Sequence, residues 1–391
     1  MNTVHQVSGN QLMLLKNGAA YFPQLCADID AAQHSIYLET YIFFADETGL
    51  MVVGALRRAA ARGVSVRVLL DGYGSAEFPR KLVDELRAEN VQVQWFRREI
   101  SPFTLQRSRM RRLRRLHRKL VVLDGEVAFV GGINIINDIS SRDHFNSPRL
   151  DYAVRVQGEL AKEIHGTMRR LWGMVSWANF RRRGKELRRF VMERTNPVPR
   201  GITLLLRDNL RHRHDIEDAY LDAIAGAQRE IIIANAYFLP RSVFRQALVQ
   251  AVQRGVRVVL LLQGRVEYRV QHYATHALYD QLLAGGVEIY EYQPSYLHAK
   301  VAVVDGRWAT VGSSNIDPYS LLLALEANLA VQDEGFAGEL RESLLAAIDG
   351  EAVRIGEGYG AARSWMDRVI ARISYGIVRL LIGLLGYGRS I

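Results

Sequence analysis

Two short stretches of the chain repeat the same polar residues at the same spacing. Each has a histidine, a lysine two residues later and an aspartate five residues after that: His117, Lys119 and Asp124 in the first stretch, and His298, Lys300 and Asp305 in the second. Each stretch is followed at the same distance by a glycine-led segment, G-G-I-N with Asn134 and G-S-S-N with Ser313 and Asn315. A single copy would be weak evidence, but the duplicated pattern indicates one site that is built from two halves.

The residue types in this repeat favour chemistry on a phosphodiester. Alternate side chains of a strand share a face, so the H-x-K spacing places a histidine and a lysine side by side. An imidazole near neutral pH can act as a nucleophile or as an acid and base. Lysine ammonium groups and polar side chains can hold the non-bridging oxygens of a phosphate, and we expect this of Lys119, Lys300, Asn134, Asn315 and Ser313. For one copy alone, the alternative is a buried core histidine beside a surface lysine.

A further carboxylate follows each glycine-led segment. Asp151 opens D-Y-A-V-R-V and Glu326 opens E-A-N-L-A-V, so each stands at the head of an apolar run. A nucleophilic imidazole works best when a carboxylate holds its other ring nitrogen. We therefore expect Asp151 and Glu326 to orient the histidines, one each. The alternative is a strand-end carboxylate that pairs with a nearby arginine.

The residues around the motifs predict the elements that position them. The apolar runs 120–123 and 301–304 predict buried strands, and the Asp-Gly pair after each run predicts a turn. The next apolar pieces, 127–130 and 308–311, are the expected hairpin partners. Such hairpins would bring Asn134 and Asn315 back beside the histidines.

The repeat extends through most of the chain. Arg-Gly-Val at 62–64 and at 254–256 each follows a helix-period segment and opens an apolar strand. Strands that alternate with helices predict an α/β layered domain, present twice. The segment T-N-P-V-P-R-G at 195–201 predicts the boundary, which divides the chain into domains 1–197 and 198–355 and a C-terminal segment 356–391. We expect a pseudo-twofold pair whose two histidines face each other across the seam.

On these motifs the chain resembles the phospholipase D superfamily, whose signature is H-x-K-x₄-D-x₆-G-[SG]-x-N. Over about residues 10–335, segments such as I-Y-L-E-T-Y-I-F-F and A-T-V-G-S-S-N-I-D-P are similar to bacterial cardiolipin synthases, especially those of the B type. The resemblance implies two α/β/α sandwich domains and a covalent phosphohistidine intermediate. By the same analogy His117 is the nucleophile, His298 is the acid and base, and Asp124 and Asp305 are structural.

Composition sets limits on the partners. The chain has 391 residues, which is enough for two domains, and its net charge of +10 implies a negatively charged partner such as an anionic lipid surface or nucleic acid. Its only cysteine, Cys26, excludes an intrachain disulfide. The polar N-terminus is not a signal peptide, and we predict no transmembrane helix. Because the lysines supply positive charge and there is no H-E-x-x-H or carboxylate cluster, we also predict no metal and no other cofactor.

Segments outside the motifs favour a lipid substrate. Residues 364–387 place large apolar side chains at helical spacing between arginines, which is typical of an amphipathic interfacial helix; the alternative is a helix that packs on the protein body. Residues 171–180 combine tryptophans with the basic run 181–183, which suits the headgroup layer or, alternatively, a domain helix with a solvated basic end. The arginine-rich run 107–119 could line the entrance to the site, form a solvated loop or contact a nucleic-acid backbone.

These observations leave functions of different classes open. The first is a cardiolipin synthase, which transfers a phosphatidyl group from phosphatidylglycerol or another phospholipid to a glycerol hydroxyl, with phosphatidylethanolamine or free glycerol as a possible co-substrate. The resemblance implies a peripheral enzyme on the cytoplasmic side of a bacterial inner membrane. The second is a phosphodiesterase that hydrolyses phospholipid or, less in keeping with the membrane features, nucleic acid. A third is a membrane-binding scaffold, against which the intact motifs argue.

Overall fold

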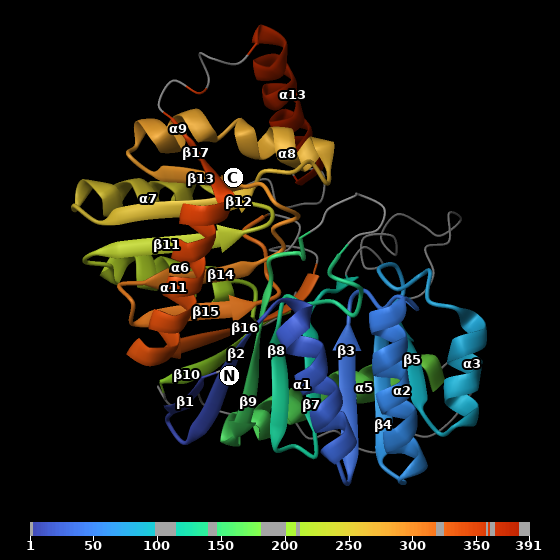
Figure 1. Ribbon diagram of the computed structural model, residues 1–391. Coiled ribbons are helices and arrows are strands. Elements are labelled where there is room, and N and C mark those ends of the chain that lie inside the picture. Colours follow the sequence, from blue (N-terminus) through green and yellow to red (C-terminus); the bar gives the residue numbers. More distant parts are fainter. Residues whose placement is uncertain are drawn as a thin grey trace.

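The fold is α/β and contains two large mixed sheets (Figure 1). The computed structural model describes residues 3–97, 115–139, 147–180, 201–208, 212–317, 324–356, 359 and 364–382. The predicted boundary at 195–201 falls almost entirely outside these residues, so the division into domains 1–197, 198–355 and 356–391 stays a prediction.

The first sheet has eight strands in the order β1-β2-β9-β8-β7-β3-β4-β5. The strands are β1 Val4–Val7, β2 Asn10–Lys16, β3 Ser35–Thr40, β4 Ser65–Asp71, β5 Gln92–Phe96, β7 Lys119–Leu123, β8 Val127–Gly131 and β9 Tyr152–Gly158. Its helices are α1 Asn17–Ala31, α2 Glu47–Ala61, α3 Arg80–Ala88 and α5 Glu159–Phe180. In Figure 1, α1 and α2 lie in front of this sheet and α5 lies behind it.

The second sheet follows the order β10-β16-β15-β14-β11-β12-β13-β17, and the short β6 pairs with β16. The strands are β6 Arg115–Leu116, β10 Ile202–Arg207, β11 Glu230–Asn235, β12 Arg257–Gln263, β13 Glu288–Tyr292, β14 Lys300–Val304, β15 Trp308–Gly312, β16 Ala324–Gln332 and β17 Ala352–Ile355. The helices are α6 Asp215–Gly226, α7 Ser242–Gln253, α8 Arg269–His276, α9 Tyr279–Ala284, α11 Glu334–Glu351 and α13 Trp365–Ile382. Without β1 and β17, the strand orders of the two sheets coincide, which confirms the predicted duplication.

The hairpins after the two motifs form as the sequence predicts. In the first, Lys119 pairs with Gly131 and Leu123 with Val127; the equivalent β14–β15 hairpin has the same antiparallel register. Both turns begin with an aspartate in the left-handed region, Asp124 at φ 54° and Asp305 at φ 55°. An Asp-Gly pair tolerates this conformation, so the local sequence determines where each strand reverses.

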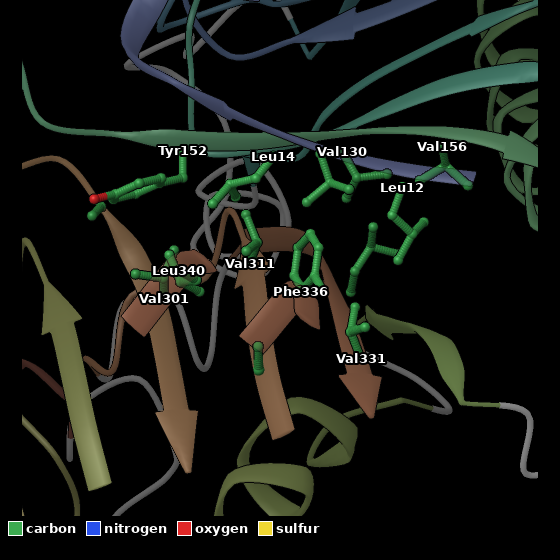
Figure 2. Packing of buried hydrophobic residues seen from close by; sticks show 14 of the residues in the cluster. Leu12, Leu14, Val130, Tyr152, Val156, Val301, Val311, Val331, Phe336 and Leu340 are labelled. Atoms are coloured by element: carbon green, nitrogen blue, oxygen red, sulfur yellow. The ribbon is translucent and has the colours of Figure 1, made fainter. Parts of the chain in front are cut away.

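Each sheet buries both of its faces, because the strand residues alternate between two cores. In β7, Leu120 and Val122 point to one side, while Val121 and Leu123 point to the other, under α1, α2 and α3. The first of these cores is shared by the two halves, and Figure 2 shows Leu12 and Val130 of the first sheet facing residues of β14–β16 and α11. The two halves therefore fold against each other through one continuous apolar core.

Two of the segments predicted to contact membrane are helices that pack on the body. In α5, Leu171 and Val175 are buried against the first sheet, while Met174 and Trp177 are exposed. The helix α13 packs on α8 through a narrow face of small side chains that includes Ala371 and Val378. The basic run 181–183 lies outside the described residues.

The side of α13 opposite this packed face is apolar and exposed. Its large side chains on this side are Trp365, Met366, Val369, Ile370, Ile373, Ile377 and Leu380. The helix therefore combines the two alternatives that its sequence allows, since one face packs on the protein and the other is left uncovered. None of the helices in the described ranges is long and apolar enough to span a membrane.

Candidate active site

The two motif histidines lie where the halves meet. Each lies two residues before its strand, and its backbone is held by the other half: His117 N donates to Leu325 O over 3.0 Å, and His298 N donates to Leu150 O over 2.8 Å. On the His117 side this contact continues as the parallel pairing of β6 with β16. The residues just before His117 therefore run beside the residues that lead to Glu326. Likewise, the residues just before His298 run beside those that lead to Asp151.

As a result, each histidine pairs with a carboxylate from the opposite half. His117 Nδ1 lies 3.0 Å from Glu326 Oε1, and His298 Nδ1 lies 2.6 Å from Asp151 Oδ2. The sequence predicts one carboxylate for each histidine, and the structure adds that the pairs are crossed. Because Nδ1 is occupied in both rings, Nε2 is the nitrogen available for chemistry.

Burial controls the protonation of these groups. It lowers the pKa of His117, although the charge of Glu326 opposes the shift. It lowers the pKa of His298 well below its ordinary value, with the positive charges of Lys300 and Lys119 acting in the same direction. Desolvation also raises the pKa of Asp151 to about 7. A neutral imidazole, which nucleophilic attack requires, is therefore favoured before substrate binds, while an arriving phosphodiester anion favours the imidazolium.

Both motif lysines are buried in this centre. Lys119 Nζ donates to His117 O over 2.6 Å, and Lys300 Nζ donates to His298 O. Burial lowers the pKa of Lys119 to about 7 and that of Lys300 to about 8. The site therefore holds cationic groups that have already lost their water, which suits the binding of a phosphate.

The polar residues of the glycine-led segments have different contacts. Asn134 Oδ1 accepts a hydrogen bond from Ile42 N over 3.2 Å, and Asn315 is buried nearby in the second half. The sequence predicts a phosphate contact for Ser313, whereas its hydroxyl donates to Glu326 Oε2 over 2.6 Å. Ser313 thus holds the carboxylate that orients His117.

The residue equivalent to Ser313 in the first half is Gly132, and the difference follows from space. A Cβ atom on Gly132 would lie 2.3 Å from Asp151 Oδ1. The side chain of Asp151 is shorter than that of Glu326, so its carboxylate stays close to the backbone. Only a glycine fits beside it. In place of a serine hydroxyl, Asp151 Oδ1 accepts from Tyr152 N over 2.8 Å.

The motif aspartates lie at the hairpin turns, where they bind backbone. Asp124 accepts from the amides of Gln33, His34 and Ser35, each over 2.8 Å. Asp305 binds the equivalent amides of Gln228, Arg229 and Glu230. Each aspartate ties a hairpin to the start of the neighbouring strand, which agrees with the structural role implied by resemblance.

Sequence reasoning did not assign the groups that hold the backbone just before each histidine. Asp71 Oδ2 accepts from Leu116 N over 2.8 Å, and Gln263 Oε1 accepts from Leu297 N over 2.9 Å. Both residues end equivalent parallel strands, β4 and β12. The sequence signal that could have identified these two residues is the repeated strand ending, L-D-G at 70–72 and L-Q-G at 262–264.

Arg118, within the predicted basic run, is not at an entrance. It is buried and pairs with Glu39, with Arg118 Nε 2.5 Å from Glu39 Oε2. The equivalent residues of the second half are Ala299 and Ala234, so only one half contains this ion pair. Arg115 lies over the ring of Tyr73 at 4.9 Å, and 107–114 are outside the described residues.

In the described part of the chain, no cluster of His, Cys, Asp or Glu could hold a metal ion.

Comparisons with known proteins show the family of the chain. A family model described as "Cardiolipin synthase, PLD-like domain" matches residues 25–172 and 220–347. Cardiolipin synthase B of Escherichia coli (strain K12) is 38% identical over 384 residues, which cover 97% of this chain and 90% of that protein. The probable cardiolipin synthase YwiE of Bacillus subtilis (strain 168) is 30% identical and covers 83% of this chain and 63% of its own.

Solved structures with the same fold have distant sequences. The crystal structure of phosphatidylserine synthase from Haemophilus influenzae Rd KW20 superposes with a TM-score of 0.69 at 14% identity, covering 96% of this chain and 95% of that one. Polyphosphate kinase from Porphyromonas gingivalis has a TM-score of 0.59 at 14% identity, covering 94% of this chain and 53% of that one. At this level of identity the likeness concerns the fold alone.

Proposed function

The chain belongs to the cardiolipin synthase family with a phospholipase D-like domain, and we propose from this premise how its site makes cardiolipin. The enzyme is a phosphatidyltransferase that acts on phospholipids such as phosphatidylglycerol. The observation that carries the mechanism is the crossed pairing of two buried histidines with Glu326 and Asp151.

The first step makes a covalent intermediate. Nε2 of neutral His117 attacks the phosphorus of phosphatidylglycerol, and the bond from phosphorus to the headgroup oxygen breaks. Protonated His298 gives its Nε2 proton to the departing glycerol oxygen. Lys119 and Lys300, with Asn134 and Asn315, stabilise the charge on the equatorial oxygens. Glu326 stabilises the positive charge on the phosphorylated His117 ring.

The second step reverses the proton transfer. A glycerol hydroxyl, either free or at the headgroup of a second phosphatidylglycerol, loses its proton to His298. Its oxygen attacks phosphorus, and the phosphorus–nitrogen bond to His117 breaks. Attack by a second lipid yields cardiolipin, whereas attack by water would yield phosphatidic acid, so control of the acceptor decides the product.

The same premise places the enzyme at a membrane, and we propose that α13 docks it there. Exposed apolar residues on α13 face away from α8, and Arg368, Arg372 and Arg379 on the same helix can bind anionic headgroups. The N-terminus of α8 adjoins Tyr268, which is exposed and whose ring lies 5.8 Å from the ring of Tyr237, just after β11 beside the motif strand β14. Contact through α13 would thus bring the mouth of the site to the lipid surface, on the cytoplasmic side of a bacterial inner membrane.

Lipid product analysis tests this function. Wild-type protein with phosphatidylglycerol vesicles, with and without phosphatidylethanolamine or glycerol, is expected to form cardiolipin that mass spectrometry identifies. His117→Ala and His298→Ala should form none. Phosphatidic acid as the sole product would favour a hydrolase, and cardiolipin made by His117→Ala would refute the covalent route. Trapped phosphate on His298 instead of His117 would reverse their roles.

A further inference from the structure

The two halves differ at one pair of equivalent positions next to the histidines. Tyr41 follows β3 and Ala236 follows β11, in the same register relative to the motif strands. The Tyr41 ring lies 4.8 Å from the His117 ring, and Lys119 Nζ lies 5.5 Å from the Tyr41 ring. The first half is therefore closed by an aromatic ring where the second half has only a methyl group.

Ala236 instead lines a pocket, which we call the alcohol pocket. It is partly open to solvent and has a cavity volume of about 20 Å³, and its polar walls include Tyr237, Gln263, Glu267, Tyr268 and His272. The helix α8 forms one of these walls. A cavity of this size admits about one water-sized group, such as a single hydroxyl of an alcohol, and no acyl chain.

The alcohol pocket is built onto the residues that flank His298. Ala236 N donates to Ala299 O over 3.0 Å, and Gln263 Oε1 accepts from Leu297 N over 2.9 Å. Burial dominates the lowered pKa of Lys300, but the negative charge of Glu267 is close enough to oppose it. The pocket therefore belongs to the His298 side of the reaction centre.

Its polar groups can recognise hydroxyls. Because Gln263 Oε1 accepts from a backbone amide, the amide orientation is determined, and Nε2 must be the donor that remains. Gln263 is 9% exposed, and its Nε2 has no hydrogen-bond partner among the residues that the structure describes. In the lining of the same pocket, the Tyr237 hydroxyl donates to Glu267 Oε2 over 2.5 Å. A pocket lined by a buried donor without a partner and by a carboxylate matches a ligand that both accepts and donates hydrogen bonds.

We propose that the alcohol pocket binds the glycerol group that leaves and the one that enters, with Glu267 and Gln263 as the residues that select a polyol. The proposal rests on the proposed transferase function and deepens it. A glycerol held there lies beside His298, which agrees with His298 as the acid and base for both alcohols and with His117 as the nucleophile on the closed side. A site that bonds substrate hydroxyls discriminates strongly against an analogue that lacks them.

Competition between alcohols tests the pocket. Wild-type enzyme is given phosphatidylglycerol vesicles with equal concentrations of isotope-labelled glycerol and ethanol, and mass spectrometry measures the ratio of labelled phosphatidylglycerol to phosphatidylethanol. In Glu267→Ala we expect this ratio to fall by about 10-fold or more, because a hydrogen bond to a charged group is lost. The matched control is Glu334→Ala, a surface glutamate paired with Arg307, in which the ratio should stay at the wild-type value.

A second variant fills the space. Ala236→Tyr copies the first half and should suppress transfer to glycerol more than transfer to ethanol, with thermal unfolding used to check that it folds. If wild type transfers phosphatidyl groups but Glu267→Ala keeps the wild-type ratio, the alcohol pocket is wrong and the transferase function stands. If wild type transfers to no alcohol, the proposed function itself fails. If Ala236→Tyr does not fold, the result for Glu267→Ala alone decides whether the alcohol pocket is correct.

Discussion

At the scale of single residues, the buried lysines make the reaction sensitive to pH. The pKa of Lys119 is lowered to about 7 and that of Lys300 to about 8, in both cases mainly by burial. As pH rises through this window, the free enzyme loses the charges that hold the phosphate. We expect kcat/KM to fall above about pH 7–8, since it reports the free enzyme, and kcat to fall at higher pH, since a bound phosphate stabilises the ammonium.

Rate measurements against pH in wild type and Lys119→Arg check this prediction. Arginine stays charged throughout this range. The variant should therefore lose the fall in kcat/KM near pH 7, which Lys119 causes, and keep the fall near pH 8, which Lys300 causes. An identical kcat/KM profile in the two proteins would show that another group controls the fall.

The two kinds of aspartate in the repeat should behave differently when the charge is removed. Asp151→Asn leaves His298 in the wrong tautomer and should reduce kcat by about 10³- to 10⁴-fold, by comparison with the catalytic triad. Asp124→Asn weakens three backbone contacts at a turn, so it should cost about 1–2 kcal/mol of stability with little loss of kcat. Denaturant unfolding and steady-state rates on both variants separate the effects. Equal losses of kcat would contradict this division of roles.

Asp124 also has a defined dependence on pH. Burial alone would raise its pKa, but the backbone donors at Gln33, Ser35 and His34 outweigh it and hold the pKa below the ordinary value. The contribution of Asp124 to stability is therefore present above the pKa of the unfolded chain and is lost as pH falls through the lower folded value.

The sequence could predict which side chains the structure brings together at the candidate site, because each is duplicated at a fixed spacing. Asp151 and Glu326 were found in the same way, but a repeat does not tell whether a carboxylate serves its own half or the other. Ser313 and Gly132 show a further limit. Their difference becomes intelligible only when the lengths of Asp151 and Glu326 are seen in three dimensions, because the space beside each carboxylate decides which residue fits.

At the scale of elements, the halves differ in the strands that carry the motifs. The Arg118–Glu39 pair links β3 and β7, where the second half has alanines. Arg118→Ala would leave a buried carboxylate unpaired and should destabilise the protein by about 3–5 kcal/mol. Adding Glu39→Ala copies the second half and should recover part of this loss. Denaturant unfolding of the three variants in a double-mutant cycle measures the coupling, and additive losses would mean that the pair is uncoupled.

The helix α13 offers a second prediction at this scale. Ile373→Glu with Ile377→Glu places charges on its uncovered face without touching the face that packs on α8. Vesicle flotation with phosphatidylglycerol and phosphatidylethanolamine should show binding weakened by at least about tenfold, as should deletion of 364–391. The matched control is Leu50→Glu, since Leu50 on α2 is similarly exposed. Unchanged binding in the double variant and the deletion would remove α13 as the anchor.

Hairpins were predictable at this scale because an Asp-Gly turn and alternating apolar residues specify both ends of a strand pair. The short β6 was not, because its partner β16 belongs to the other half and two residues carry no periodic pattern. Likewise, the spacing of apolar residues in α13 predicted an amphipathic helix. It could not separate the small residues that pack on α8 from the large ones that stay exposed.

At the scale of the whole molecule, the two halves share their core as well as their active site. Phe336 and Leu340 of α11 are fully buried in the cluster that also contains Leu12 and Val154 of the first sheet. The alternating strands predicted two buried faces for each sheet, but no local pattern indicates which face belongs to the shared core. Since neither half can bury this surface alone, unfolding of one half exposes apolar surface of the other.

The crossed pairs make a prediction about the functional unit. One chain contains both histidines and both carboxylates of a single site, so His117→Ala and His298→Ala should each abolish transfer instead of halving it. A mixture of the two variants should stay inactive, because a chain with one histidine cannot be completed by another chain with the same packed core. Activity that returns after mixing, or after joint refolding from denaturant, would mean that the halves can exchange between chains. In that case the crossed contacts at Leu150 and Leu325, which form within one chain in the structure, would form between two chains and make a subunit interface.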